Sequence, residues 1–176
     1  MNATLIKDGK LEEVKFIVNG KERVILKCYH DNGKLKEETR YTNGKKHGIS
    51  KTYYKTGELE TETPYIDGKQ HGIYKGYYKT GELRANIPVI HGERNGIHKE
   101  YYENGKLMSE IPFVNGKRHG VWKWYYESGK LMSETPYKNG EANGIEQVYY
   151  ENGKLKRETS YKNGEIAYIK YPKRRR

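Results

Sequence analysis

Apolar and polar residues alternate in short segments along the chain, and glycine-containing dipeptides separate these segments. Between Ile97 and Phe113, aromatic and branched residues lie on both sides of Asn104-Gly105. Alternation with a period of two is typical of a β-strand with one buried face, and Asn-Gly between two such segments is a strong signal for a β-hairpin. The pattern therefore predicts two strands joined by a two-residue type I′ turn, in which Asn104 and Gly105 both have positive φ.

This hairpin unit recurs with a period of 24 residues. Two series of glycines carry the period: Gly9, Gly33, Gly57, Gly81, Gly105, Gly129 and Gly153, and Gly20, Gly44, Gly68, Gly92, Gly116, Gly140 and Gly164. The sequence thus predicts an all-β repeat protein, an elongated and curved antiparallel meander of about seven hairpins. We expect a degraded N-terminal capping repeat over 1–24, the repeat array over 25–164, and a last strand with a basic tail over 165–176.

Charged residues on facing strands indicate the register of each hairpin. With a two-residue loop, Glu103 faces Lys106 and Lys99 faces Glu110. In every copy the pair next to the loop is opposite in sign, and its order is reversed in two of the six copies. Because opposite charges across strands stabilise a sheet and like charges destabilise it, these compensated exchanges support the register.

The register also sorts the side chains onto two faces, because alternate residues of a strand point to opposite sides. One face collects the leucine of each copy, a Thr or Ile, and a series of rings at Tyr41, Tyr65, Phe113, Tyr137 and Tyr161. The other face collects the Lys/Glu pairs, Ile97 and its counterparts, and the prolines. We expect the first face to be the drier one, and the accumulated twist of the strands to make one face a groove.

The second connection of each unit, for example from Val114 to Gly120, contains another Asn-Gly and one further glycine. This composition indicates a turn followed by either a bulge or a wider loop. The sequence leaves both alternatives open.

The amino-acid composition indicates a thin and well-solvated fold. The chain has 176 residues, of which 34% are hydrophobic and 32% charged, with a mean hydropathy of -1.11. So little apolar material cannot build a thick core. The 18 tyrosines and the strict period nevertheless oppose disorder, since disordered segments contain few aromatic residues.

The net charge of +11 and the pI near 9.4 favour acidic partners, whether proteins, anionic lipid headgroups or nucleic acid. No signal peptide is evident after Met1, and no stretch approaches the length of about 20 apolar residues that a membrane span needs. We therefore expect a soluble cytoplasmic protein without a transmembrane segment. The one cysteine, Cys28, cannot form an internal disulfide, which is consistent with a reducing compartment.

The unit from Gly96 to Gly120, with its Tyr-Tyr, Asn-Gly-Lys-Leu and His-Gly elements, resembles the MORN repeat variant, and the same repeat occurs in YwqK-type antitoxin components. Asn95 and Asn143 depart from the pattern by replacing the His of His-Gly, and Val89 replaces a ring. The resemblance implies an antiparallel interaction scaffold with no catalytic motif. For YwqK-type members it implies cytoplasmic neutralisation of a toxin, and for other MORN proteins it implies scaffolding and phospholipid binding.

A cluster of aromatic residues in one copy is the leading candidate site. Trp122, Trp124 and Tyr126 alternate and should project from one face, flanked by Phe113 and Tyr137. Both tryptophans of the chain lie in this copy, so they depart from the repeat. Aromatic residues of this kind form the energetic centre of many protein interfaces, and local core packing is the alternative.

Three histidines, His47, His71 and His119, share one repeat position. Equivalent positions lie two strands apart, about 9.6 Å, which is too far for two imidazoles to bind one ion. We therefore predict a turn-forming role, and no metal site or cofactor. For the paired tyrosines, packing within the sheet is favoured over a stacking platform for nucleic acid.

The chain ends in a basic tail, Lys173, Arg174, Arg175 and Arg176. This tail is either solvated or attracted to the acidic surface of a partner.

Motifs for nucleotide binding, zinc hydrolysis or a nucleophilic serine are absent, so no enzyme is expected. The sequence predicts a protein-binding scaffold, an antitoxin or immunity-type protein that neutralises a partner protein of the toxin class. The alternative is a peripheral module for anionic lipids or nucleic acid, with weak electrostatic binding. A choline-binding role is opposed by the few tryptophans and the lack of an export signal.

Overall fold

The computed structural model describes residues 4–7 and 10–172, and every regular element in these ranges is a β-strand. The chain divides into two compact units, residues 1–93 and 94–176. Unit 1 contains β1 (Thr4–Lys7), β2 (Leu11–Val18), β3 (Lys21–Tyr29), β4 (Leu35–Thr42), β5 (Lys45–Lys46), β6 (Gly48–Tyr53), β7 (Leu59–Ile66), β8 (Lys69–Gln70), β9 (Gly72–Tyr77) and β10 (Leu83–Ile90). Unit 2 contains β12 (Gly96–Tyr101), β13 (Leu107–Val114), β14 (Lys117–Arg118), β15 (Gly120–Tyr125), β16 (Leu131–Lys138), β17 (Glu141–Ala142), β18 (Gly144–Tyr149), β19 (Leu155–Lys162) and β20 (Glu165–Lys170). The short strand β11 (Glu93–Arg94) spans the boundary.

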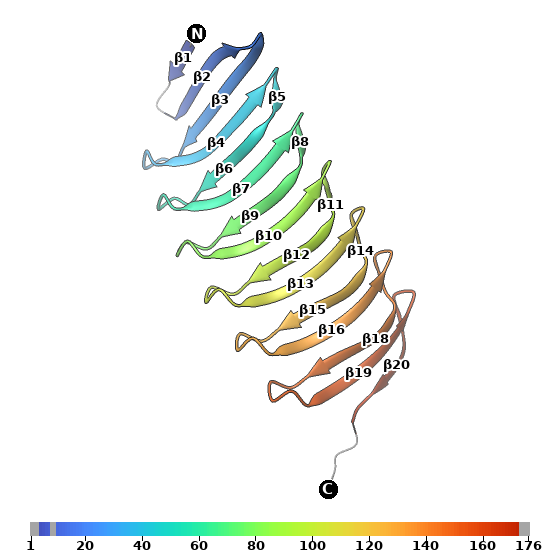
Figure 1. The fold of residues 1–176 in the computed structure, drawn as a ribbon. Coiled ribbons are helices and arrows are strands. Elements are labelled where there is room, and N and C mark those ends of the chain that lie inside the picture. The colour runs from blue at the N-terminus through green and yellow to red at the C-terminus, as the bar shows by residue number, and fades with distance from the viewer. Residues whose placement is uncertain (1–3, 8–9, 173–176) are drawn as a thin grey trace. The chain divides into compact units, whose positions relative to one another are not determined.

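Each unit is an antiparallel meander in which consecutive strands pair (Figure 1). In unit 1 the long strands pair in the order β1, β2, β3, β4, β6, β7, β9 and β10. In unit 2 the order is β12, β13, β15, β16, β18, β19 and β20. The predicted all-β hairpin repeat is therefore confirmed.

The turn at Asn104-Gly105 is not the predicted type I′ turn. The Tyr102 N–H donates to the Lys106 carbonyl at 2.8 Å, and the Gly105 N–H donates to the Tyr102 carbonyl at 2.9 Å. Gly105 alone in this loop has positive φ, 77°. This is a type I turn followed by a glycine bulge, so the predicted facing of Glu103 and Lys106 is wrong, because Glu103 lies within the loop.

A β-bulge restores the predicted register farther from the loop. Tyr101 pairs with Leu107, and the register then shifts by one residue at Met108. Beyond the bulge Lys99 pairs with Glu110, and their side chains form an ion pair at 3.2 Å. The predicted Lys99 and Glu110 pairing is confirmed.

The type I′ turn instead lies at the second Asn-Gly of each unit. Val114 pairs with Lys117, and φ is 50° at Asn115 and 75° at Gly116. The same positive φ occurs before each glycine of the second series, at Asn19, Asn43, Asp67, His91, Asn115, Asn139 and Asn163. These are residue types that tolerate the left-handed region.

A two-residue bulge follows this turn, which decides between the alternatives that the sequence left open. Phe113 pairs with Arg118, but Glu110 pairs with Lys123, so the later strand accommodates two extra residues. Gly120 adopts a φ of 112° there. A Cβ atom at Gly120 would lie 3.0 Å from Cγ of Pro112, so the bulge requires glycine for both its conformation and its space.

The hairpin of β2 and β3 lacks this bulge. The register of β2 and β3 is continuous from Val18 opposite Lys21 to Leu11 opposite Cys28. Val24 stands where the other copies have Gly48 or Gly120, and a branched residue avoids the positive φ that the bulge needs. The strand pairing of β2 and β3 is therefore uninterrupted, whereas the equivalent pairings in the other repeats are interrupted by the bulge.

The two faces differ in burial as predicted. We call the face that carries Ser109, Ile111 and Phe113 the inner face, and the face that carries Ile97 and Lys99 the outer face. Ser109 is 0% exposed and Phe113 6%, whereas Ile97 is 49% exposed. Within the described residues no second layer covers the strands, and the long strands are bent along their length (Figure 1). Side chains so deeply buried in a single layer indicate that the inner face lies on the concave side of these bends.

Candidate functional site

An aromatic cluster lies on the inner face of unit 2. The ring centroids of Trp122 and Trp124 are 5.8 Å apart, and those of Trp122 and Tyr137 are 5.9 Å apart. The rings are tilted by 58° and 48°, within the range of favourable aromatic pairs. Three of the five residues predicted for the site therefore come together, from the neighbouring strands β15 and β16.

Phe113 and Tyr126 lie beside this cluster in different ways. Phe113 is buried on β13, and its ring packs near His98 with a centroid distance of 6.2 Å. Tyr126 follows the end of β15 and donates its hydroxyl to the Tyr149 carbonyl at 2.8 Å. Equivalent bonds join Tyr54 to Tyr77 and Tyr102 to Tyr125, so the hydroxyl at this repeat position ties one hairpin to the next.

Two arginines cover the rings, and the sequence analysis did not identify them. The Arg118 guanidinium lies 4.9 Å from the Trp122 ring centroid and 5.3 Å from that of Tyr137. The Arg94 guanidinium lies 5.4 Å from the Phe113 ring centroid. Such cation–π contacts stabilise by about 0.5–2 kcal/mol, depending on exposure. The available signal was the type I′ turn at Asn115-Gly116, which places Arg118 directly opposite Phe113.

The guanidinium groups of Arg94 and Arg118 make no ion pair and no hydrogen bond with any described residue. The inner-face carboxylates near the cluster are already engaged. Glu100 accepts a hydrogen bond from Ser109 at 3.1 Å, and Glu146 accepts one from Arg157 at 2.8 Å. The patch formed by Arg94, Phe113, Arg118, Trp122, Trp124 and Tyr137, which we call the arginine–aromatic patch, therefore keeps its positive charge uncompensated.

His98 lies next to Phe113 of this patch and is only 5% exposed. Its Nε2 atom is 3.5 Å from Oε1 of Glu100. Burial lowers the pKa of His98; the Glu100 carboxylate opposes this shift, and the positive charge of Arg94 adds to it. His98 is therefore neutral at pH 7 and acts as a packing residue rather than as a charge on the surface.

One polar atom of the cluster has no partner. Nε1 of Trp122 is buried and makes no hydrogen bond. An unsatisfied buried donor costs about 1–3 kcal/mol of stability. The contacts of the Trp122 ring with Trp124 and Tyr137 offset this cost.

The histidines of the repeat loops have backbone roles. The N–H groups of His71 and His119 donate to the carbonyls of Pro64 and Pro112, each at 3.0 Å. These bonds close the bulge that follows each type I′ turn. Nowhere in residues 4–7 and 10–172 do three or more His, Cys, Asp or Glu side chains gather as a metal ion would require.

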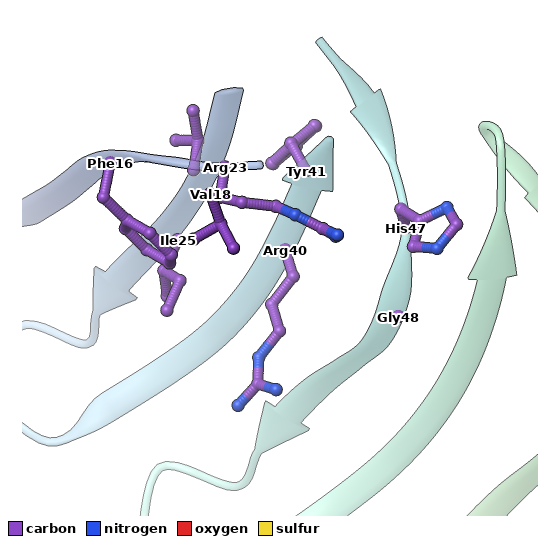
Figure 2. A pocket seen from close by; sticks show the side chains of 9 residues that line it. Phe16, Val18, Arg23, Ile25, Arg40, Tyr41, His47 and Gly48 are labelled. Atoms are coloured by element: carbon purple, nitrogen blue, oxygen red, sulfur yellow. The ribbon is translucent and has the colours of Figure 1, made fainter. Parts of the chain in front are cut away.

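Unit 1 has a hollow where its unbulged hairpin meets the first bulged one (Figure 2). Phe16, Val18 and Ile25 line its apolar part, and its volume is about 360 Å³. Arg23 and Arg40 line it too, but Arg23 donates to Thr42 at 2.6 Å and Arg40 pairs with Glu38 at 3.1 Å. This hollow contains no residue of the predicted site.

The basic tail, Lys173, Arg174, Arg175 and Arg176, lies outside the described residues, so its prediction stays a prediction.

The family model for the MORN repeat variant matches residues 24–43, 46–67, 70–90, 94–115, 118–139 and 142–163. The chain belongs to the MORN repeat variant family. The six MORN matches together cover well over half of the chain and include the arginine–aromatic patch. A comparison of the chain with curated proteins finds no match. Its described residues form no helix long and apolar enough to cross a bilayer.

Proposed function

We propose that this MORN repeat protein is a protein-binding scaffold that holds an acidic segment of a partner on the inner face of unit 2. The observation that carries the proposal is the arginine–aromatic patch, in which Arg94 and Arg118 lie on rings without an acidic partner. Interface centres are enriched in Trp, Tyr and Arg. The net charge of +11 adds attraction for an acidic partner at longer range.

The proposed role is non-enzymatic. Glu100, Glu146 and His98 are bonded or buried on the inner face. Groups that are engaged in this way suit the positioning of neighbouring side chains better than the transfer of a proton to a substrate.

The narrower form of the proposal is an antitoxin or immunity-type role, in which the acidic partner is a toxin neutralised in the cytoplasm. Its support is the resemblance of the repeat unit to YwqK-type antitoxin components. A toxin gene next to the gene for this chain would favour this form, and an isolated gene would oppose it.

A second candidate is peripheral binding to anionic lipid or nucleic acid, which the net charge favours. The two candidates differ in their dependence on salt. Binding to a polyanion weakens steeply between about 50 and 200 mM salt, whereas a contact centred on buried rings depends less on salt.

The test is affinity purification of the full chain with its native partner, identified by mass spectrometry, at both salt concentrations. We expect the W122A/W124A variant to lose the partner, and the outer-face control Ile97→Ala to keep it. The proposal fails if W122A/W124A retains the partner as well as the unchanged protein does. Loss of all binding at the higher salt concentration would favour the second candidate.

A further inference from the structure

Arg94, Phe113 and Arg118 form a row across three strands of unit 2. Phe113 on β13 is paired with Gly96 on one side and with Arg118 of β14 on the other. Arg94 precedes Gly96 by two residues and lies over the Phe113 ring. The Arg94 guanidinium therefore lies over Phe113, and the Arg118 guanidinium lies over Tyr137, the equivalent ring of the next repeat.

The strand spacing determines the separation of these two arginines. Arg94 and Arg118 occupy the same position in consecutive repeats, 24 residues apart. Equivalent positions lie two strands apart, and strands are about 4.8 Å apart, so the separation is about 9.6 Å. The line between them runs across the strands.

Both arginines are prepared for binding acidic groups. A guanidinium stacked on a ring keeps its N–H edges available, and it loses less side-chain entropy on binding than a freely moving one. Its planar fork binds a carboxylate through two parallel hydrogen bonds. Two such groups at a fixed separation select carboxylates at the same separation.

We propose that Arg94 and Arg118 bind two acidic side chains of one partner segment, three residues apart in a polyproline II conformation. This inference rests on the proposed function and adds the spacing and conformation of the partner. Polyproline II has three residues per turn and rises about 3.1 Å per residue, so residues i and i+3 point the same way about 9.3 Å apart.

Other backbone conformations fit the two arginines less well. In a β-strand, residues i and i+3 point to opposite sides, and residues i and i+2 are only about 6.8 Å apart. In an α-helix the nearest match is i and i+7, at about 10.5 Å. The rings of Trp122 and Tyr137 beside Arg118 add the aromatic surface on which polyproline II segments dock.

Unit 1 supplies an internal control. Lys46 lies over the Tyr65 ring with its Nζ atom 5.2 Å from the centroid. Tyr65 is paired with Gln70, however, so the next repeat has a neutral amide where unit 2 has Arg118. Two arginines at consecutive repeat positions, each stacked on a ring, therefore distinguish unit 2.

The test uses the full chain and three proline-rich peptides of identical composition, each with two glutamates at i and i+2, i and i+3, or i and i+4. A fourth, helix-forming peptide has its glutamates at i and i+7. Dissociation constants are measured by isothermal titration calorimetry. We expect the i and i+3 peptide to bind about tenfold more tightly than the other two proline-rich peptides, which corresponds to about 1.4 kcal/mol. Arg94→Gln and Arg118→Gln should each remove this preference, whereas the matched control Lys46→Gln should preserve it.

Three results would overturn the inference: equal binding of all three proline-rich peptides, tighter binding of the helical peptide, or tighter binding of single-stranded DNA than of any peptide. Equal binding would leave the proposed function standing if W122A/W124A still lost the native partner. If W122A/W124A kept that partner and the peptides still bound with the expected preference, the proposed function would fail and the arginine spacing would stand.

Discussion

Apart from the β2–β3 hairpin, which lacks the bulge, the repeats of the two units have the same turn and bulge geometry but different inner faces. The second-series turn has a φ of 49° at Asp67 in unit 1 and 50° at Asn115 in unit 2. At one inner-face repeat position, however, unit 1 has Ser50 and Tyr74, whereas unit 2 has His98 and Trp122. The periodic residues therefore maintain the backbone, and the positions that vary are available to determine what each unit binds.

The difference is largest where cations meet rings. In unit 1 Tyr65 has Lys46 on one side and Gln70 on the other. In unit 2 Phe113 lies between Arg94 and Arg118. Only in unit 2 do the described residues place arginines stacked on rings at two consecutive repeat positions.

The largest expected effect concerns the shared backbone. Gly120→Val should destabilise the protein by about 3 kcal/mol, because a branched residue is strained at a φ of 112° and its Cβ would lie 3.0 Å from Pro112. Urea denaturation measures the change. The matched control is Gly105→Asn, whose Cβ would meet nothing within 4 Å at a φ of 77°, which Asn tolerates. Equal losses in the two variants would contradict the bulge.

The two turns of one repeat should differ in the stability that is lost when their Asn is replaced by Thr, and this effect is smaller. Asn115→Thr should cost about 1–2 kcal/mol, because Thr is strained at positive φ. Asn104→Thr should cost less than about 0.5 kcal/mol, since Asn104 does not have positive φ and Thr56 and Thr80 occupy the same position in unit 1. Thermal unfolding of both variants tests the assignment, which would be wrong if Asn104→Thr were the more damaging change.

A pH-dependent difference between the units should come from His98. Burial lowers its pKa in the folded protein, so the unfolded chain binds the proton more readily. Stability present above pH 6.5 should therefore fall as the pH decreases through that value. His98→Ser, which copies Ser50 of unit 1, should remove this component from the denaturation midpoints measured between pH 5 and 8. An unchanged pH profile in His98→Ser would show that His98 is not buried as described.

The smallest effect concerns the ion pair of Lys99 and Glu110, which are 3.2 Å apart. A double-mutant cycle with Lys99→Ala and Glu110→Ala should give a coupling free energy of about 0.2–1 kcal/mol, because the pair is partly exposed. The corresponding pair in unit 1, Lys51 and Glu62, should give a similar value, since its distance is also 3.2 Å. A zero coupling in both units would remove this support for the register.

The period and charge pattern were sufficient to predict the hairpins, the drier face and the pairing of Lys99 with Glu110. They were not sufficient to locate the type I′ turn, because the copy used for the prediction has Asn-Gly at both Asn104 and Asn115. The distinction lies in the other copies. Thr56, Thr80 and Ser128 precede the first glycine series, and such residues avoid positive φ.

The candidate site was only partly predictable. The alternation of Trp122 and Trp124 placed them correctly, and Tyr137 joins them from the next strand. The contribution of Arg118 depends on its pairing with Phe113, which follows only after the turn at Asn115 is assigned correctly. Side-chain packing in three dimensions, such as Arg94 over Phe113, has no signature along the chain.

The most direct test of the account is a nitrogen–proton NMR titration of the full chain with the peptide that carries glutamates at i and i+3. The chain has two tryptophans, Trp122 and Trp124, so their indole N–H signals report on the inner face of unit 2. We expect both indole signals to shift together with the amides of Arg94, Phe113 and Arg118, while the amides around Tyr65 in unit 1 stay in place. Shifts confined to outer-face residues such as Ile97, or equal shifts in both units, would contradict the account.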